Sequence, residues 1–265
     1  MLDNSYLLLA AAKSGNSSPL VIVIALVGFA LAFGIVFYLV ARQKKAMADF
    51  ALKNGWQAIN NDDSTLANYV PTYLLNNSES LGHKYEMAYS ANVSGQNIIF
   101  FKYDDSVRVH EVNNPSANEQ IVSSIAAFEV QQSFNNLLIL HHSRVANFGL
   151  HPDLQKFNLE GDFSNYFDVY APQGSSIETL SLLTPDIMAF LIDQGKHAHW
   201  NIQIKEHVVS IEGDAYLISP SKITDLLNYA VALKQKLDAK PVLQADAVSP
   251  NAQPANNQPQ PQNNE

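Results

Sequence analysis

The sequence predicts an α+β protein with one N-terminal transmembrane helix, followed by a soluble domain that has a largely antiparallel sheet and two or three helices. Three observations support this fold class. An uncharged apolar run covers residues 20–41, short apolar segments separated by turn-forming residues follow over residues 56–218, and helix-start signals interrupt them at residues 184–185 and 219–220. Strands that follow one another with few helices between them favour antiparallel pairing over a βαβ arrangement.

The apolar run reads LVIVIALVGFALAFGIVFYLVA and contains no charged side chain. As a helix that rises about 1.5 Å per residue, it spans about 33 Å, which is enough for a hydrocarbon core of about 30 Å. A core helix of a soluble protein would carry a polar stripe, and this run has none. A cleaved signal peptide fits poorly, because its apolar region would be only about 7–15 residues long. The run therefore predicts a membrane-spanning helix.

The charges beside this helix predict its orientation. Arg42, Lys44 and Lys45 follow the span directly, whereas Lys13 is the one basic residue before it. Cytoplasmic flanks carry the excess of Lys and Arg. We therefore expect a single-pass protein of the cell membrane, with its soluble domain in the cytoplasm and a short N-terminal stub outside.

The sequence divides into four parts: a stub at residues 1–19, the transmembrane helix at 20–41, a soluble α+β domain at 42–240, and a tail at 241–265. The tail is rich in Pro, Gln and Asn and poor in core-forming residues, which predicts disorder. Within the span, Gly28 and Ala32 form a small-xxx-small pair that would let two helices approach closely and form a homodimer. The alternative is that Gly and Ala are simply common in membrane helices.

The composition narrows the classes of function. The chain has 265 residues, a formal net charge of −9 and no cysteine. We expect no nucleic-acid partner, because neutralising phosphates requires a basic face. Without cysteine there is no disulfide, no thiolate nucleophile and no Cys-ligated zinc. The expected partners are the lipid bilayer and a protein that the sequence does not name.

The strand pattern predicts a hairpin around the turn at Ser94-Gly95-Gln96, and several further short strands. The expected strands are residues 85–93 and 97–104, a pair at 121–130 and 136–143 preceded by a loop at 113–120, a pair at 163–172 and 176–183, and three short strands at 199–207, 208–213 and 215–220.

The segment LLTPDIMAFLIDQG suggests either a catalytic corner or a helix start. Thr184 suits an N-cap, Pro185 suits the first helical position, and Asp186 complements the positive end of the helix dipole. Gly195 can end the helix. Since every feature has a structural role, we interpret the segment as a helix start.

Two other helices are predicted from periodicity. Ser219-Pro220 opens one of them in the same way as the segment at Thr184. The second continues the transmembrane helix after residue 41, with Met47, Phe50 and Ala51 along one face and a stop at Asn54-Gly55.

These segments together resemble a family of uncharacterised bacterial membrane-anchored proteins whose domain has no assigned function. The resemblance rests on Gly55-Trp56, the predicted hairpin, an F-x-x-Y motif at residues 163–166 and an L-T-P-x-h-M motif at residues 183–188. It is best over residues 157–218. It implies a membrane helix followed by a mixed α/β domain, and it implies no activity.

Histidines supply the candidate metal ligands. His197 and His199 would share a face about 7 Å apart if they lay on a strand, and His207 or Glu206 would be a third ligand. The alternative is a set of solvent-facing histidines beside a loop. The adjacent His141 and His142 would point to opposite faces of a strand and cannot chelate one ion together.

Acidic residues supply the candidate acid/base groups. Glu160 and Asp162 flank Gly161, which fits either a pair of catalytic carboxylates or an ordinary turn. The pairs Asp62-Asp63 and Asp104-Asp105 lack the ligand spacing of a calcium loop, so we expect them to be solvated turn residues.

The sequence contains no recognised motif of a phosphate loop, a nucleophile elbow, a zinc protease or a dinucleotide site. We therefore predict no catalytic or cofactor-binding residue, no cofactor and no bound metal. The leading hypothesis is a non-catalytic binding or scaffolding domain at the cytoplasmic membrane face. The alternative is an enzyme, or a sensor of a small ligand or metal, that uses the Glu160–Asp162 turn or the His197/His199 region.

Overall fold

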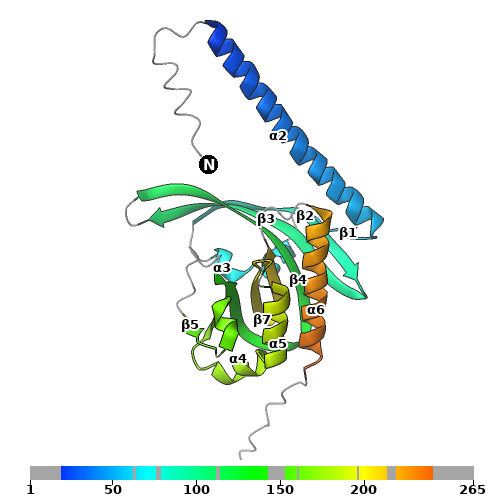
Figure 1. Cartoon of the computed structure of the whole chain (residues 1–265), viewed down its shortest axis with the longest axis vertical. Helices are drawn as coiled ribbons and strands as arrows, with labels where there is room; N and C mark the ends of the chain where they lie inside the picture. Colours follow the sequence, from blue (N-terminus) through cyan, green and yellow to red (C-terminus); the bar gives the residue numbers. More distant parts are fainter. Residues whose placement is uncertain are drawn as a thin grey trace, which may run out of the picture.

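The computed structural model has a long helix, α2 (Pro19–Lys53), that leaves one end of an α+β domain (Figure 1). The predicted fold class is confirmed. The structure describes residues 19–61, 64–75, 79–111, 114–142, 153–159, 161–195, 197–213 and 219–240. Nearly all of the predicted stub, and the whole tail at 241–265, lie outside these residues.

Helix α2 contains both the predicted span and its continuation. Its stretch Ile22–Lys53 has a mean hydropathy of 2.7 over its most apolar window, none of which is buried in the protein. Within the described part of the chain it is the one helix long and apolar enough to cross a membrane. The helix stops where predicted, because Gly55 takes a positive φ of 69° and redirects the chain.

The sheet is antiparallel throughout, with the strand order β1-β2-β3-β4-β6-β5 and with β7 also paired to β4. Its strands are β1 (Gln57–Ala58), β2 (Glu79–Val93), β3 (Gln96–Glu111), β4 (Asn114–His141), β5 (Leu154–Phe157), β6 (Phe167–Pro172) and β7 (Asn201–Gly213).

The predicted β2–β3 hairpin is present. Val93 pairs with Gln96, and the two residues between them, Ser94 and Gly95, have φ angles of 52° and 78°. Two positive φ angles in a two-residue loop are typical of a type I′ turn, whose twist matches that of the strands.

The predicted strand pair at 121–130 and 136–143 is wrong. Residues 121–130 and 136–141 both belong to β4, a single 28-residue strand that bends without reversing, and residue 143 lies outside the described residues. Its first half pairs with β3 as far as Ala127, its second half pairs with β6 from Leu138, and β7 follows both halves with register shifts between Glu129 and Leu137. The Gln, Ser and Asn residues at the bend are typical of a turn, which is why the sequence predicted two strands here. The predicted loop at 113–120 is likewise strand from Asn114 onward.

Three other strand predictions are corrected. Residues 176–182 form a helix, α4 (Ser176–Leu182), in which Thr179 and Leu182 are buried three positions apart. The first residues of the predicted strand at 163–172 belong to a 3-10 helix, η3 (Gly161–Asn165). The strands predicted at 199–207 and 208–213 are one continuous strand, β7, and 215–218 lies outside the described residues.

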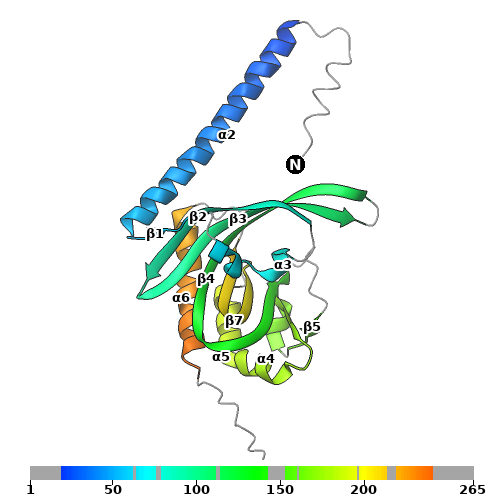
Figure 2. The ribbon, with the colours of Figure 1, turned by 180° about the vertical axis from the view of Figure 1, so that it is seen from behind.

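The sheet is covered on both faces. Helices α5 (Pro185–Gly195) and α6 (Pro220–Asp238) pack on one face, and η1 (Ser64–Tyr69) and α3 (Thr72–Leu75) pack on the other (Figure 2). Neighbouring strand residues point to opposite faces. Phe100 therefore enters the core beneath α6, and Phe101 enters the core beneath η1 and α3; both side chains are fully buried.

The two predicted helix starts are in place. Ser219 caps α6 by accepting a hydrogen bond from the backbone N–H of Lys222, at 3.4 Å. Helix α5 begins at Pro185 as expected, but the Thr184 hydroxyl donates to the Asp186 carboxylate instead of accepting from the backbone. This hydrogen bond lowers the pKa of Asp186.

Candidate functional site

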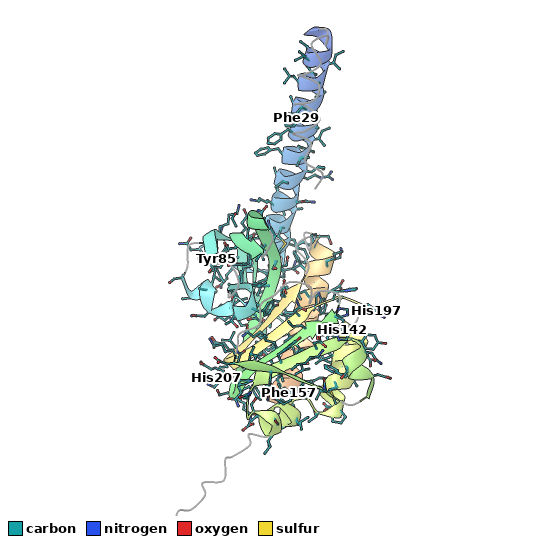
Figure 3. The ribbon with its side chains drawn as sticks, turned by 90° about the vertical axis from the view of Figure 1, so that its left-hand side faces the viewer. Phe29, Tyr85, His142, Phe157, His197 and His207 are labelled. Carbon is teal, nitrogen blue, oxygen red and sulfur yellow. The ribbon has the colours of Figure 1, made fainter. Side chains whose placement is uncertain are left out.

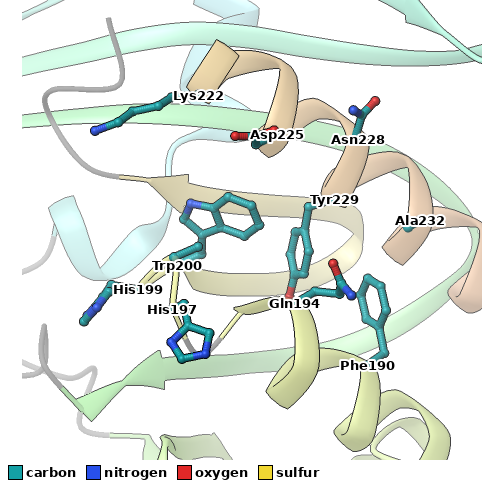
Figure 4. A pocket seen from close by; sticks show the side chains of 11 residues that line it. Phe190, Gln194, His197, His199, Trp200, Lys222, Asp225, Asn228, Tyr229 and Ala232 are labelled. Atoms are coloured by element: carbon teal, nitrogen blue, oxygen red, sulfur yellow. The ribbon is translucent and has the colours of Figure 1, made fainter. Parts of the chain in front are cut away.

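A cavity of about 740 Å³ opens between α5, α6 and the turn that leads into β7 (Figure 4). Small-molecule sites usually have volumes of about 300–1,000 Å³. The lining residues come from all three segments: Phe190, Gln194, His197, Ala198, His199, Trp200, Lys222, Asp225, Asn228, Tyr229 and Ala232. We call this cavity the α5–α6 pocket.

Helix periodicity explains why α6 forms one wall of the pocket. Apart from one adjacent pair, its lining residues recur every three or four positions, which places them on one side of the helix: Lys222, Asp225, Asn228, Tyr229 and Ala232. The neighbouring face of α6 is buried against the sheet, and this fixes the rotation of the helix about its axis.

Aromatic rings make up the apolar part of the pocket. The ring of Tyr229 is 5.1 Å from that of Phe190 in a stacked arrangement, and 4.4 Å from that of Trp200 in a tilted one. Tyr229 is only 5% exposed, and its burial raises the pKa of its phenol. The hydroxyl therefore stays protonated at physiological pH.

The rim of the pocket is polar and exposed. Gln194, His197 and Asn228 can each donate and accept hydrogen bonds. Lys222 and Asp225 add one positive and one negative charge. The pocket thus combines an apolar floor with polar side chains that are open to solvent.

The structure separates the candidate metal ligands. His197 and His199 lie in the turn before β7 rather than on a strand, and His199 takes a positive φ of 54°. His207 lies in β7, about 20 Å of extended strand beyond the turn that contains His199. Figure 3 shows it on the other side of the domain from His197. The described residues contain no group of three His, Asp or Glu side chains that could hold a metal ion.

The candidate carboxylate turn is only partly described. Glu160 lies outside the described residues. Asp162 is exposed at the start of η3, where it accepts a hydrogen bond from Asn165 at 3.4 Å, and Gly161 has a φ of 80°. For the described residues this is the geometry of a turn.

Sequence reasoning missed a buried polar cluster on the opposite face of the sheet. Glu212, only 1% exposed, accepts hydrogen bonds from Tyr73 at 2.6 Å, Ser123 at 2.7 Å and Asn201 at 2.8 Å. A buried carboxylate is stable only when several donors replace its water shell. Ser210 and Glu212 alternate with apolar residues along β7, so the sequence alone suggests that they face solvent. In the structure, α3 covers Glu212.

Asp104 and Asp105 are not the solvated turn residues that we expected. Both lie in β3 and are 6% and 1% exposed. Asp104 accepts a hydrogen bond from Gln120 at 2.9 Å and forms an ion pair with Lys84 at 3.4 Å. Asp105 accepts from the Tyr103 hydroxyl at 2.8 Å. The other acidic pair, Asp62-Asp63, lies outside the described residues.

His141 and His142 make separate contacts, as expected of strand neighbours. The ring of buried His141 is 4.5 Å from that of His199, whereas His142 lies 2.9 Å from the Asp168 carboxylate. Burial opposes the ionisation of Asp168, but hydrogen bonds from Lys156 and His142 outweigh it and lower the pKa of Asp168.

The two polar regions therefore differ in what they can do. The Glu212 cluster is closed to solvent and ties α3 to the sheet, so its role is structural. The α5–α6 pocket is open to solvent, which makes it the candidate ligand site.

Comparison with known proteins gives a likeness of fold alone. No protein-family model matches the chain, and no curated protein matches its sequence. Among solved structures, the crystal structure of the mycobacterial trehalose monomycolate transport factor A, TtfA, is similar, with a TM-score of 0.53 and 9% sequence identity. The match covers 76% of this chain and 97% of that chain. Membership of the uncharacterised membrane-anchored family stays a prediction.

Proposed function

We propose that this protein is a single-pass membrane-anchored, non-catalytic domain that binds or scaffolds a protein partner at the cytoplasmic face of the cell membrane. The observation that carries the proposal is the junction between α2 and the domain. The apolar helix continues directly into the core of the domain, which suits a domain held at the membrane surface.

The end of α2 is packed against the domain and charge-paired with it. Met47 and Ala51 are 0% and 1% exposed, and the Lys44 ammonium lies 3.2 Å from the Glu86 carboxylate on β2. Met47 follows residue 41 by six positions, or about 9 Å of helix. The domain would therefore sit within one helix diameter or so of the lipid headgroups.

The charge asymmetry supports the cytoplasmic side. Arg42, Lys44 and Lys45 follow the apolar run, and Lys13 precedes it. Net charge of −9 supports a partner other than nucleic acid.

An exposed apolar face supports a protein partner. Ile177 and Leu180 lie three positions apart on α4 and are 79% and 56% exposed. Helix α4 lies at the end of the domain opposite α2 (Figures 1 and 2). Neighbouring apolar side chains that stay exposed often mark a protein interface. The solved structure with a similar fold is named as a transport factor.

Two fractionation experiments test the anchoring and its sidedness. We expect the protein to stay in membranes after washing with alkaline carbonate, and its release would contradict a spanning helix. In intact spheroplasts, external protease should leave the domain uncut. Digestion there would reverse the orientation without affecting the anchor.

Proximity labelling in native cells tests the partner. We expect the Ile177→Ser, Leu180→Ser double variant to lose specific labelled proteins. Leu52→Ser is the matched control, since Leu52 is also 79% exposed but lies on α2. Equal labelling by all three proteins would remove α4 from the interface, and labelling no different from that of an unrelated anchored protein would contradict the binding role.

Self-association of the span is a separate proposal. Gly28 has nothing within 4 Å of the position where a Cβ would stand, so Gly28→Ile fits the single helix and would block close approach at the Gly28/Ala32 face. Loss of cross-linked dimer in this variant would support the homodimer. Wild-type protein that yields no dimer would contradict it.

A second candidate function is the sensing of a small ligand. The observation that favours it is that His197 and His199 line the α5–α6 pocket. A metal assay on protein purified without chelator tests the metal version of this idea, and metal-free protein would exclude it.

A further inference from the structure

We propose that the α5–α6 pocket binds an uncharged, polyhydroxylated ring, such as a free sugar or the sugar headgroup of a neutral glycolipid. This inference goes beyond the anchored protein-binding role. It names a ligand class for a site that the proposed protein interface on α4 does not use.

The charge of the lining excludes strongly charged ligands. Lys222 and Asp225 contribute one charge of each sign, three positions apart on α6. The nearby Lys236 is already engaged, since its ammonium lies 5.5 Å from the Phe190 ring centre and 3.8 Å from Asp186. A phosphate would need several cationic groups, and a cation would need several anionic ones, whereas the lining offers one of each. The electrostatically neutral lining therefore matches a neutral ligand.

The polar rim matches hydroxyl groups. Gln194, His197 and Asn228 each present both donor and acceptor atoms, and they come from α5, the turn and α6. A hydroxyl also donates and accepts, so one ring with several hydroxyls can satisfy side chains from all three directions. A purely apolar ligand would instead strip water from these groups without replacing their hydrogen bonds.

The floor matches the apolar face of a sugar ring. Trp200 and Phe190 flank the buried Tyr229 (Figure 4); Trp200 is 7% exposed and Phe190 is half-buried, so Phe190 is the more accessible of the two rings. Aromatic faces carry partial negative charge and attract the slightly positive C–H groups of such a ring. Phe190 stacks on the Tyr229 ring and Trp200 packs against it at a tilt, so a flat aromatic ligand cannot insert between these rings.

Trp200 provides a direct signal for the test. The chain has two tryptophans, Trp56 and Trp200, so Trp56→Phe leaves Trp200 as the only source of tryptophan fluorescence. Trp56 packs edge-on against Phe50, and phenylalanine retains a ring there. Full-length Trp56→Phe protein in phosphatidylcholine nanodiscs is titrated with glucose, galactose and maltose, and with the charged analogues glucosamine and glucuronate.

We expect a saturable change in Trp200 fluorescence with at least one neutral sugar, at a Kd of about 1–10 mM. Gln194→Ala and Asn228→Ala should each weaken binding by about threefold to tenfold, which is the effect of one lost hydrogen bond. Gln235→Ala is the matched control, because Gln235 is an exposed amide on α6 outside the pocket. Circular dichroism confirms that each variant is folded.

A second titration distinguishes the source of the ring. Nanodiscs that contain monogalactosyldiacylglycerol replace the soluble sugars, and a response to these alone assigns the ligand to a lipid headgroup. Either source supports the proposal. It is overturned if no neutral sugar, soluble or lipid-borne, gives a saturable change, if the charged analogues bind as well, or if the rim variants bind like Gln235→Ala. None of these outcomes affects the proximity-labelling result, so the two experiments test the sugar site and the protein-binding role independently.

Discussion

Tyr73→Phe tests whether the Glu212 cluster holds α3 on the sheet. The substitution removes one hydroxyl and keeps the ring, which is 1% exposed. The lost hydrogen bond, 2.6 Å long, goes to a carboxylate that is also 1% exposed. A hydrogen bond to a charged group contributes about 1.5–3 kcal/mol, and water cannot replace it in this position. For a domain of this size the melting temperature should therefore fall by about 3–12 °C.

Thermal unfolding of full-length protein in detergent, followed by circular dichroism, measures this effect. Tyr69→Phe is the matched control, because the Tyr69 hydroxyl donates to Glu129 at the surface, at 3.1 Å. Exposed polar contacts contribute about 0–1 kcal/mol, so this variant should melt within a few degrees of wild type. If both variants lowered the melting temperature equally, Glu212 would not be sealed beneath α3 and the structural role of the cluster would be wrong.

Three other substitutions probe the end of α2, the hairpin and the half-buried carboxylate of Asp168. Met47→Ala should lower the free energy of unfolding by about 2–5 kcal/mol in urea, because Met47 is fully buried where α2 meets the core, whereas Leu52→Ala should change it by less than about 0.5 kcal/mol. Equal effects would contradict the docking of α2. Gly95→Ala should cost about 1 kcal/mol, since Gly95 has a φ of 78°, and an unchanged urea midpoint would exclude the left-handed turn. Asp168 has a pKa below its usual 3.8. Its favourable contribution to the folding stability is therefore present above pH 3.8 and disappears as the pH falls through the lowered pKa. The difference in stability between wild type and Asp168→Asn should therefore be constant near neutral pH and shrink in acid; a difference that grows in acid would reverse this assignment.

Local patterns predicted the elements that depend on nearby residues. The β2–β3 hairpin follows from Ser94-Gly95, and α6 follows from Ser219-Pro220 and its apolar stripe. In each case the deciding contacts join residues a few positions apart. Long-range pairing was harder to predict. The bend of β4 looked like a turn, since only its pairing with β3, β6 and β7 shows that the strand continues.

The candidate site shows the same division. His197 and His199 were identified from their spacing, and they do lie together beside a cavity. The residues that make this cavity a candidate binding site, Asn228 and Tyr229, come from a helix about 30 positions further along the chain. Their spacing on α6 identifies a helix face, but nothing local indicates which segment lies opposite.

The sequence by itself determined the long apolar helix, the α+β class and the starts of α5 and α6. The patterns that indicate them, which are hydrophobic length, alternation and capping, each lie within one to six helical turns of chain. Only the tertiary structure decided which polar residues are buried and which line a cavity. Asp105 and Glu212 look like surface residues in the sequence, and they are enclosed because α3 and η1 fold over that face of the sheet. The free energy of a polar side chain depends on the neighbours that replace its water, and for these residues the neighbours are distant in sequence.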